Sequence, residues 1–315
     1  MRTLVIGLGS MGFGAAVSCV RAGIQTTGFD VNPDALERFQ AQGGQSIQSL
    51  DACVDIDCVL IFVVNAAQAE SVLFESDLLS KLNPNALVIN CVTLAPSKAI
   101  EIAKNVKDGG FRYIDAPVSG GAAKALDGRM SIMASGAPHA MRDAKPIFDA
   151  ISEHVFELGD DPGNGSQMKL VNQLLAGVHI AAAAEAMNLA ASLNMNLHQV
   201  IDVISKCAGS SWMFENRAPH IADGDYTPLS SVNIFVKDLG IVTDEASRHR
   251  VVTPLSDAAL SLYQKASESG LGSEDDSAIV KILAQNGAVA LGHTVDNYMT
   301  SKLVSCTPDA TADQV

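Results

Sequence analysis

Short apolar runs alternate with amphipathic or alanine-rich stretches through the first half of the chain. The apolar runs predict six strands, at residues 2–7, 24–30, 57–64, 86–90, 111–118 and 130–135. The spacing of apolar positions between them predicts crossover helices at residues 10–22, 33–41, 67–81, 96–107 and 138–150. Strands that alternate with helices build a parallel sheet. Residues 1–161 are therefore expected to form a doubly wound α/β domain.

The pattern changes after Asp160. The turn-forming sequence DDPGNG is followed by about thirty residues that lack a turn signal and are rich in alanine, which predicts one long helix. Further helices are predicted at residues 197–207, 233–248 and 254–269. We therefore expect an all-α domain over residues 162–283, entered by the long helix, and a C-terminal tail of mixed polarity over residues 284–315.

Composition and charge argue against nucleic-acid and membrane partners. The 315 residues carry 35 acidic and 21 basic side chains, so a net charge of −14 leaves no electrostatic footprint for nucleic acid or an anionic membrane. The most alanine-rich segment, residues 176–193, contains His179 and Glu185 and is expected to be a buried helix rather than a membrane span. The chain opens without a recognisable export leader. These features predict neither a nucleic-acid partner nor a membrane partner.

The six cysteines contain no CxxC pair, and the seven histidines contain no HxH or HxxxH pair. Several cysteines lie in apolar runs, where a free thiol behaves as a small hydrophobic side chain. We expect a reducing cytoplasm, no disulfide framework and no metal site.

A glycine loop follows the first predicted strand. Gly7, Gly9 and Gly12 form GxGxxG, in which the glycines permit a tight turn, a close approach to a pyrophosphate and close helix packing. The second strand ends at Asp30, at the expected distance for a carboxylate that binds the adenosine ribose hydroxyls. This order predicts a Rossmann-type domain that prefers NAD over NADP, because Asp30 would repel a 2′-phosphate. The structural alternative is that the glycines serve turns and Asp30 caps the next helix.

Two further groups could handle an acid substrate. Ser119, Gly120 and Gly121 follow a strand and precede a short helical stretch, so their main-chain amides and the hydroxyl could bind a carboxylate, or form an ordinary turn. Lys169 lies one turn into the long helix, and Asn172 and Gln173 lie on the same face. A buried Lys169 near a nicotinamide cation would have a lowered pKa and could accept a proton from an alcohol; the alternative is a solvated lysine.

Four motifs in this order, GLGSMG, DAPVSGG, GNGSQMKLVNQ and IFVKDLG, resemble those of the β-hydroxyacid dehydrogenase family, which includes 3-hydroxyisobutyrate dehydrogenase and tartronate semialdehyde reductase. The resemblance implies that Lys169 is the catalytic acid/base, that Ser119, Gly120 and Gly121 bind the substrate carboxylate, and that Lys237 lies near the cofactor. Thr93, in NCVTLAP, matches a threonine that approaches the nicotinamide ribose in relatives. The expected cofactor contacts are Gly7, Leu8, Gly9, Ser10, Met11, Gly12, Asp30, Val64, Asn65, Thr93 and Lys237.

One position departs from the family pattern. Relatives usually place asparagine four residues after the lysine, whereas here Gln173 stands there and Asn172 stands at three, so either amide is a candidate for substrate binding. The segments KLVNQLLAGVHIAAAAEAM, SSWMFENRAPHIADGDYTP and GSEDDSAIVKI resemble the L-threonate dehydrogenase branch, and the similarity extends over residues 2–283. Further polar candidates for substrate binding, or for packing between helices, are Ser211, Trp212, Glu215 and Asn216.

The expected function is NAD-dependent oxidation of the 2-hydroxyl of L-threonate, or of a similar four-carbon sugar acid, to the 2-oxo acid. A 3-hydroxyisobutyrate dehydrogenase or a tartronate semialdehyde reductase would share every motif. A non-catalytic NAD-binding module is a more distant alternative, against which the presence of Lys169 argues. The helix at residues 176–193 is apolar nearly all round, which predicts a homodimer or homotetramer.

Overall fold

The computed structural model describes residues 1–284, so the expected C-terminal tail lies outside the described residues except for Ala284. The described residues form two compact units, one made of Met1–Val178 and Thr227–Asp276, the other of His179–Tyr226 and residues 277–284. The long helix α8, Asn164–Ser192, contributes to both units. The sequence-based domain ranges 1–161 and 162–283 stay predictions.

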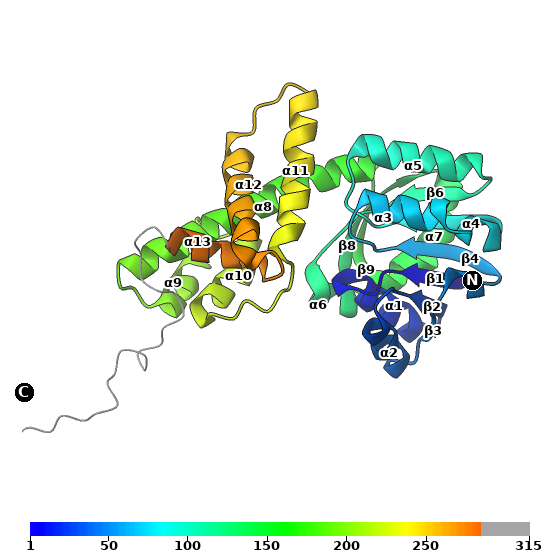
Figure 1. Cartoon of the computed structure of the whole chain (residues 1–315), viewed down its shortest axis with the longest axis horizontal. Coiled ribbons are helices and arrows are strands. Elements are labelled where there is room, and N and C mark those ends of the chain that lie inside the picture. Colours follow the sequence, from blue (N-terminus) through cyan, green and yellow to red (C-terminus); the bar gives the residue numbers. More distant parts are fainter. Residues whose placement is uncertain (285–315) are drawn as a thin grey trace, which may run out of the picture. The chain divides into compact units, whose positions relative to one another are not determined.

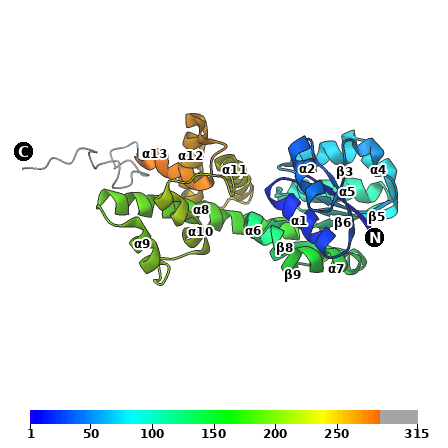
Figure 2. The same ribbon diagram turned by 90° about the horizontal axis from the view of Figure 1, so that it is seen from below.

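A nine-stranded sheet occupies residues 2–157, with helices on both of its faces (Figures 1 and 2). The strands run in the order β3-β2-β1-β4-β5-β6-β8-β7, and β9 pairs with β8. Their bounds are β1 Arg2–Ile6, β2 Gln25–Phe29, β3 Gln45–Ile47, β4 Ile56–Ile61, β5 Leu82–Asn90, β6 Arg112–Asp115, β7 Val118–Ser119, β8 Met130–Gly136 and β9 Ser152–Glu157. The predicted α/β class is confirmed, although β8 runs antiparallel to β6 and β7.

The helices follow the predicted order. Their bounds are α1 Ser10–Arg21, α2 Pro33–Ala41, α3 Ala66–Glu70, α4 Leu78–Lys81, α5 Pro96–Asp108, α6 Gly121–Leu126, α7 Pro138–Ile151, α8 Asn164–Ser192, α9 Leu197–Ile204, α10 Trp212–Asp223, α11 Val232–Arg248, α12 Pro254–Ala266 and α13 Val280–Ala284. Past residue 160 the described elements are helical, as expected. A long helix entering this part is therefore also confirmed.

Alternation along each central strand produces two hydrophobic cores, one on each face of the sheet. In β1, Val5 belongs to the core that α1, α2 and α7 cover, whereas Leu4 and Ile6 belong to the core that α3 and α5 cover. All three side chains are almost fully buried. A strand buried on both faces forms a nearly continuous apolar run, as β1 does apart from the buried Thr3.

The carboxyl ends of the central strands lie in register at one edge of the sheet. Ile6 pairs with both Phe29 and Ile61, Ile61 pairs with Asn90, and Asn90 pairs with Asp115. The strand order reverses between β1 and β4. In open α/β sheets, ligands bind outside the carboxyl ends of the strands at such a reversal. The sheet thus directs the segments that follow β1, β2, β4, β5 and β6 to one edge.

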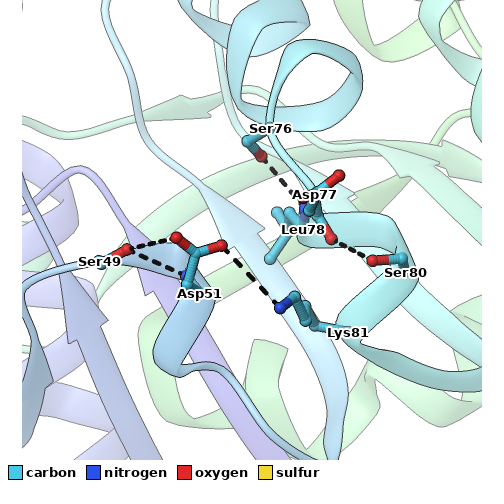
Figure 3. Close-up of polar contacts among 7 residues, drawn as sticks. All are labelled: Ser49, Asp51, Ser76, Asp77, Leu78, Ser80 and Lys81. Carbon is cyan, nitrogen blue, oxygen red and sulfur yellow. Dashed lines mark hydrogen bonds and ion pairs between the residues drawn. The ribbon is translucent and has the colours of Figure 1, made fainter.

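The helix predicted over residues 67–81 is interrupted. A π-helical turn, Ser71–Glu75, follows α3, and the backbone is extended at Ser76 before α4 begins. The Ser76 hydroxyl donates to the carbonyl of Val72 at 2.5 Å. It also accepts the Leu78 amide at 3.2 Å, and the Ser80 hydroxyl donates to the Asp77 carbonyl at 2.7 Å (Figure 3). Local hydroxyl bonds of this kind compete with the helical ladder. The prediction of one continuous helix was therefore wrong.

The part of α8 in the first unit packs against α11 and α12. The Tyr263 hydroxyl, from α12, donates to the carbonyl of Gly177 at 3.2 Å. The Tyr263 ring stacks on Phe235 of α11 with a centroid separation of 5.3 Å. These contacts hold α11 beside α8 and so bring residues 237 and 238 close to Lys169.

Candidate active site

The glycine loop connects β1 to α1 by a turn that only glycine accommodates. Gly7 has φ +88°, and a Cβ placed on Gly12 would lie 1.9 Å from the carbonyl oxygen of Gly7. Gly9 precedes α1 without any side-chain cap. The amides of the first turn, which includes Ser10 and Met11, therefore remain available to an anion. This geometry fits the pyrophosphate of a dinucleotide.

Asp30 follows β2 and joins the glycine loop to the second strand. Its Oδ2 accepts the amide of Leu8 at 2.6 Å, and its Oδ1 accepts the amide of Asn32 at 2.8 Å. The side chain that caps α2 is that of Asn32, which accepts the Asp34 amide at 3.0 Å. Asp30 is half-buried. It therefore fixes the loop while part of the carboxylate still faces solvent.

The remaining expected cofactor residues of the α/β domain follow β4 and β5. Val64 is 50% exposed, and its amide donates to the Gln68 side chain at 2.8 Å. Asn65 caps α3 by accepting the Gln68 amide at 2.9 Å. Thr93 is half-buried in the segment between β5 and α5. All three lie after strands that end at the same sheet edge as the glycine loop.

The expected carboxylate pocket forms a sharp turn. Ser119 is the last residue of β7 and pairs with Ser131 of β8. Gly120 and Gly121 have φ of +135° and +75°, a backbone region that L side chains rarely adopt. The three residues are half-buried. Such a half-buried turn, with two glycines at positive φ and one serine, suits the close approach of a carboxylate.

The first turn of α8 is anchored to the end of β6 by Asp115, which is fully buried. Its Oδ2 accepts the amides of Gly163 at 3.0 Å and Ser166 at 2.8 Å, and its Oδ1 accepts the Ser166 hydroxyl at 2.8 Å. Burial raises the pKa of Asp115, whereas these donated hydrogen bonds act in the opposite direction. Sequence reasoning assigned Asp115 no role, because an acid at a strand end has the same pattern whether it faces a ligand or a helix.

Lys169 lies on the buried side of α8, with 7% of its surface exposed. Burial lowers its pKa from 10.5 to about 8, the neighbouring cation Lys237 also lowers it, and the carboxylate of Asp238 opposes the shift. A lysine held in this way is neutral in an appreciable fraction near neutral pH, so it can accept a proton. The expected burial and lowered pKa are both present.

A short chain of polar contacts joins α8 to α11 on the segment that follows Lys169. The Asn172 amide donates to the Gln173 Oε1 at 2.9 Å, the Gln173 amide donates to Asp238 Oδ2, and Lys237 pairs with Asp238 Oδ1. Gln173 and Asp238 are buried, whereas Asn172 is only half-buried. Both ends of the Gln173 amide are thus occupied within the protein. Sequence reasoning missed Asp238, although it stands beside Lys237 in IFVKDLG.

The polar residues of the SSWMFEN segment belong to the second compact unit. Ser211 caps α10 by accepting the Phe214 amide at 3.0 Å, and the Ser210 hydroxyl donates to Glu215 at 2.7 Å. Asn216 accepts a hydrogen bond from Arg217. Trp212 is 51% exposed. Local structural roles therefore exist for Ser211, Glu215 and Asn216.

Residues 1–284 contain five cysteines, all of them free thiols. Cys19, Cys53, Cys58 and Cys91 are buried free thiols and Cys207 is an exposed one, whereas Cys306 lies outside this range. No group of three or more histidine, cysteine, aspartate or glutamate side chains in the described range could hold a metal ion.

Two family models match most of the chain. Residues 3–159 match the model of the NAD-binding domain of 6-phosphogluconate dehydrogenase, and residues 163–283 match the NAD-binding model of NADP-dependent 3-hydroxyisobutyrate dehydrogenase. The fold and these matches define the class of the protein, an NAD-binding oxidoreductase.

Individual relatives narrow the class to a family. L-threonate dehydrogenase of Haemophilus influenzae is 49% identical over 89% of this chain and 94% of its own length, and NAD-dependent L-serine dehydrogenase of Pseudomonas aeruginosa is 31% identical over 88% and 96%. The crystal structure of a Salmonella typhimurium 3-hydroxyisobutyrate dehydrogenase is 47% identical, has a TM-score of 0.85, and covers 90% of this chain and 99% of its own. The chain belongs to this hydroxyacid dehydrogenase family, as its four motifs indicated.

Proposed function

We propose that the protein oxidises the 2-hydroxyl of L-threonate, or of a similar four-carbon sugar acid, with NAD. The observation that carries the reaction type is Lys169, a lysine whose burial lowers its pKa to about 8. Five relatives named L-threonate dehydrogenase, 47% to 49% identical to this chain, support the substrate.

The proposed mechanism assigns one task to each group. Ser119 and the amides of Gly120 and Gly121 hold the substrate carboxylate, which fixes the 2-hydroxyl. Neutral Lys169 accepts the hydroxyl proton at its Nζ as the hydrogen on the same carbon departs. Bound NAD supplies the acceptor for that hydride. Asn172 is the better placed of the two amides for a substrate hydroxyl, because it is half-buried, whereas Gln173 is buried and its amide is engaged at both ends.

We infer a preference for NAD over NADP from Asp30. Its carboxylate already accepts the Leu8 amide at 2.6 Å, so it is held at the edge of the glycine loop. A fixed carboxylate can accept hydrogen bonds from ribose hydroxyls but repels a 2′-phosphate. Val64, Asn65, Thr93 and Lys237 are proposed as further contacts to the cofactor.

A smaller hydroxy acid is a second candidate, because the Salmonella structure with 47% identity carries the name 3-hydroxyisobutyrate dehydrogenase. That acid lacks two hydroxyls of L-threonate, and each buried polar group left unpaired costs about 1–3 kcal/mol. We therefore expect kcat/KM for 3-hydroxyisobutyrate to be lower by about 30-fold to about 10⁴-fold. The test compares kcat/KM for L-threonate, D-glycerate, L-serine and 3-hydroxyisobutyrate with NAD. A highest value for 3-hydroxyisobutyrate would overturn the threonate assignment but leave the reaction type intact.

The reaction type has its own test. Lys169→Ala is expected to lower single-turnover oxidation by about two to four orders of magnitude while NADH still binds. Lys104→Ala is a matched control, since that lysine lies on α5 with 71% of its side chain exposed. Retention of more than about a tenth of the wild-type rate by Lys169→Ala would show that another group is the base. Undetectable turnover by the wild type would instead favour a non-catalytic NAD-binding module.

We also propose that the protein assembles as a homodimer or homotetramer through α8. Met168, Val171 and Leu175 follow one face of this helix and are about half exposed. By length and composition, α8 is the one helix within residues 1–284 that could cross a membrane. It also carries the charged Lys169 and Glu185, which a lipid core would penalise, so we assign the apolar face to a second copy of the chain.

The free thiols of residues 1–284 and the net charge of −14 support a location in a reducing cytoplasm, without nucleic-acid partners.

A further inference from the structure

The buried carboxylate of Asp115 joins the end of β6 to the start of α8, and it has no role in the proposed mechanism. Asp115 receives three hydrogen bonds from residues 163–166, at 2.8–3.0 Å, and the Ser135 hydroxyl also donates to it. The carboxylate accepts hydrogen bonds from Gly163, Ser166 and Ser135, and it lies at the positive end of a 29-residue helix. These donors favour the carboxylate as their acceptor, although burial raises its pKa.

We propose that Asp115 is a positioning residue for the reaction: it clamps the first turn of α8 to the sheet and so sets the depth at which Lys169 is buried. The proposal rests on the proposed function of Lys169. Asp115 itself does not contact the reacting atoms and acts through the helix.

The clamp leaves the first turn of α8 little freedom to move. A Cβ added to Gly165 would lie 2.3 Å from the carbonyl oxygen of Met133 and 2.8 Å from that of Asp115, so the helix backbone rests directly on the strands. The Gly165 amide also donates to the Ser135 hydroxyl at 3.1 Å. Packing prevents the turn from approaching the sheet, and the hydrogen bonds to Asp115 prevent it from lifting away.

The first turn of α8 determines where Lys169 lies. Lys169 follows Ser166 by three residues, about 4.5 Å along the helix axis. The charged groups that act on Lys169 are Asp238 and Lys237 of α11, and the largest influence on it is burial. A change at Asp115 should therefore reach Lys169 through the placement of the helix and the entry of water.

The same strand end leads to the proposed carboxylate pocket. The chain continues from Asp115 to Ser119 within four residues, and the Ala116 amide donates to the Asn90 carbonyl at 2.9 Å. The clamp thus joins the helix that carries the proposed base to the strand that leads to the substrate anion. A fixed separation between these two groups is what orients an alcohol for proton transfer.

The test uses Asp115→Asn and Ser166→Ala in the full chain. Asp115→Asn keeps the size of the side chain but replaces one acceptor oxygen by an NH2 group, which faces the hydrogen-bond donors of residues 163–166. Ser166→Ala removes only the hydrogen bond from the Ser166 hydroxyl to Asp115. Asp57→Asn is the matched control, because Asp57 also accepts a backbone amide, that of Arg2 at 2.8 Å, but lies at the start of β4. Steady-state kinetics give kcat and the KM values for L-threonate and NAD. Hydrogen exchange is followed over residues 167–173. The pH dependence of Lys169 acetylation by acetic anhydride gives the midpoint of its titration.

Asp115→Asn is expected to lower kcat by about 10-fold to 100-fold, with the KM for NAD within about twofold of the wild-type value. Exchange over residues 167–173 should quicken, and the midpoint of Lys169 acetylation should move from about 8 toward 10.5, the ordinary lysine value. Ser166→Ala should move each quantity in the same direction by less. Asp57→Asn should lower the melting temperature without moving the acetylation midpoint.

The proposal is overturned if Asp115→Asn and Ser166→Ala leave the acetylation midpoint and the exchange of α8 at wild-type values. It is also overturned if their kcat values fall no further than that of Asp57→Asn. If Asp115→Asn does not fold, Ser166→Ala decides between these results. Absence of wild-type turnover would reject the proposed function alone, because acetylation and exchange report on the clamp without catalysis.

Discussion

The pH dependence of turnover follows from the burial of Lys169. Burial lowers its pKa from 10.5 to about 8. At about pH 7, roughly 9% of such a lysine is neutral, against roughly 0.03% for a lysine with an ordinary pKa, so the form able to accept a proton is enriched roughly 300-fold. We expect kcat/KM for oxidation to rise with pH and to level off above about pH 8.

The reverse reaction provides an internal check. Lys169 must be protonated to return a proton to the 2-oxo acid, so kcat/KM for reduction should fall as pH rises through the same midpoint. NADH absorbance, followed in both directions from about pH 6 to about pH 10, measures both profiles. A common midpoint near 10.5, or two profiles that change in the same direction, would refute the assignment.

The charges of Asp238 and Lys237 allow a further test of the pH dependence. Asp238 raises the pKa of Lys169 and Lys237 lowers it. Asp238→Asn should therefore shift the oxidation midpoint to lower pH, and Lys237→Gln should shift it to higher pH. Shifts of the same sign would show that these charges do not act on the group that titrates.

Three further predictions address the cofactor site and assembly. Gly12→Ala places a Cβ 1.9 Å from the Gly7 carbonyl oxygen, so the Kd for NADH, measured by fluorescence titration, should rise by at least about tenfold. Asp30→Ala should narrow the ratio of kcat/KM values for NAD and NADP, and equal wild-type efficiencies would contradict the role of Asp30. Leu175→Glu puts a charge on the exposed face of α8 and should lower the mass found by light scattering to that of one chain, whereas an unchanged mass would exclude this face from the interface.

Much of the fold could be predicted because hydrophobic periodicity is a local property. The continuous apolar runs of β1, β4 and β5 and the glycine loop before α1 are recognisable within a few residues. Once the strands are known to be parallel and in register, the residues that follow them must meet at one edge. The strand pattern therefore predicted where the glycine loop and Asp30 would lie, whereas Thr93 was added by the family resemblance.

The features that were missed depend on contacts distant in sequence or on mostly exposed segments. The strand β9 pairs at the margin of the sheet with most of its residues exposed, so it has no apolar run. The direction of β8 is not encoded in its apolar residues, since either direction buries them equally. Gln173 and Asp238 are 65 residues apart, and only the packing of α8 on α11 makes them partners.

Asp30 and Asp115 illustrate how similar sequence signals acquire different roles. Each is an acid at the end of a parallel strand, β2 or β6, and each accepts main-chain amides from the segment that it holds. Asp115 is fully buried and its oxygens are taken by the start of α8, so a ligand cannot reach it without displacing that helix. Asp30 is half-buried and accepts two amides, which leaves acceptor positions toward solvent. Their different exposure therefore makes Asp30 suited to bind a ribose and Asp115 suited to hold a helix. This exposure is determined by the elements that pack over each strand end.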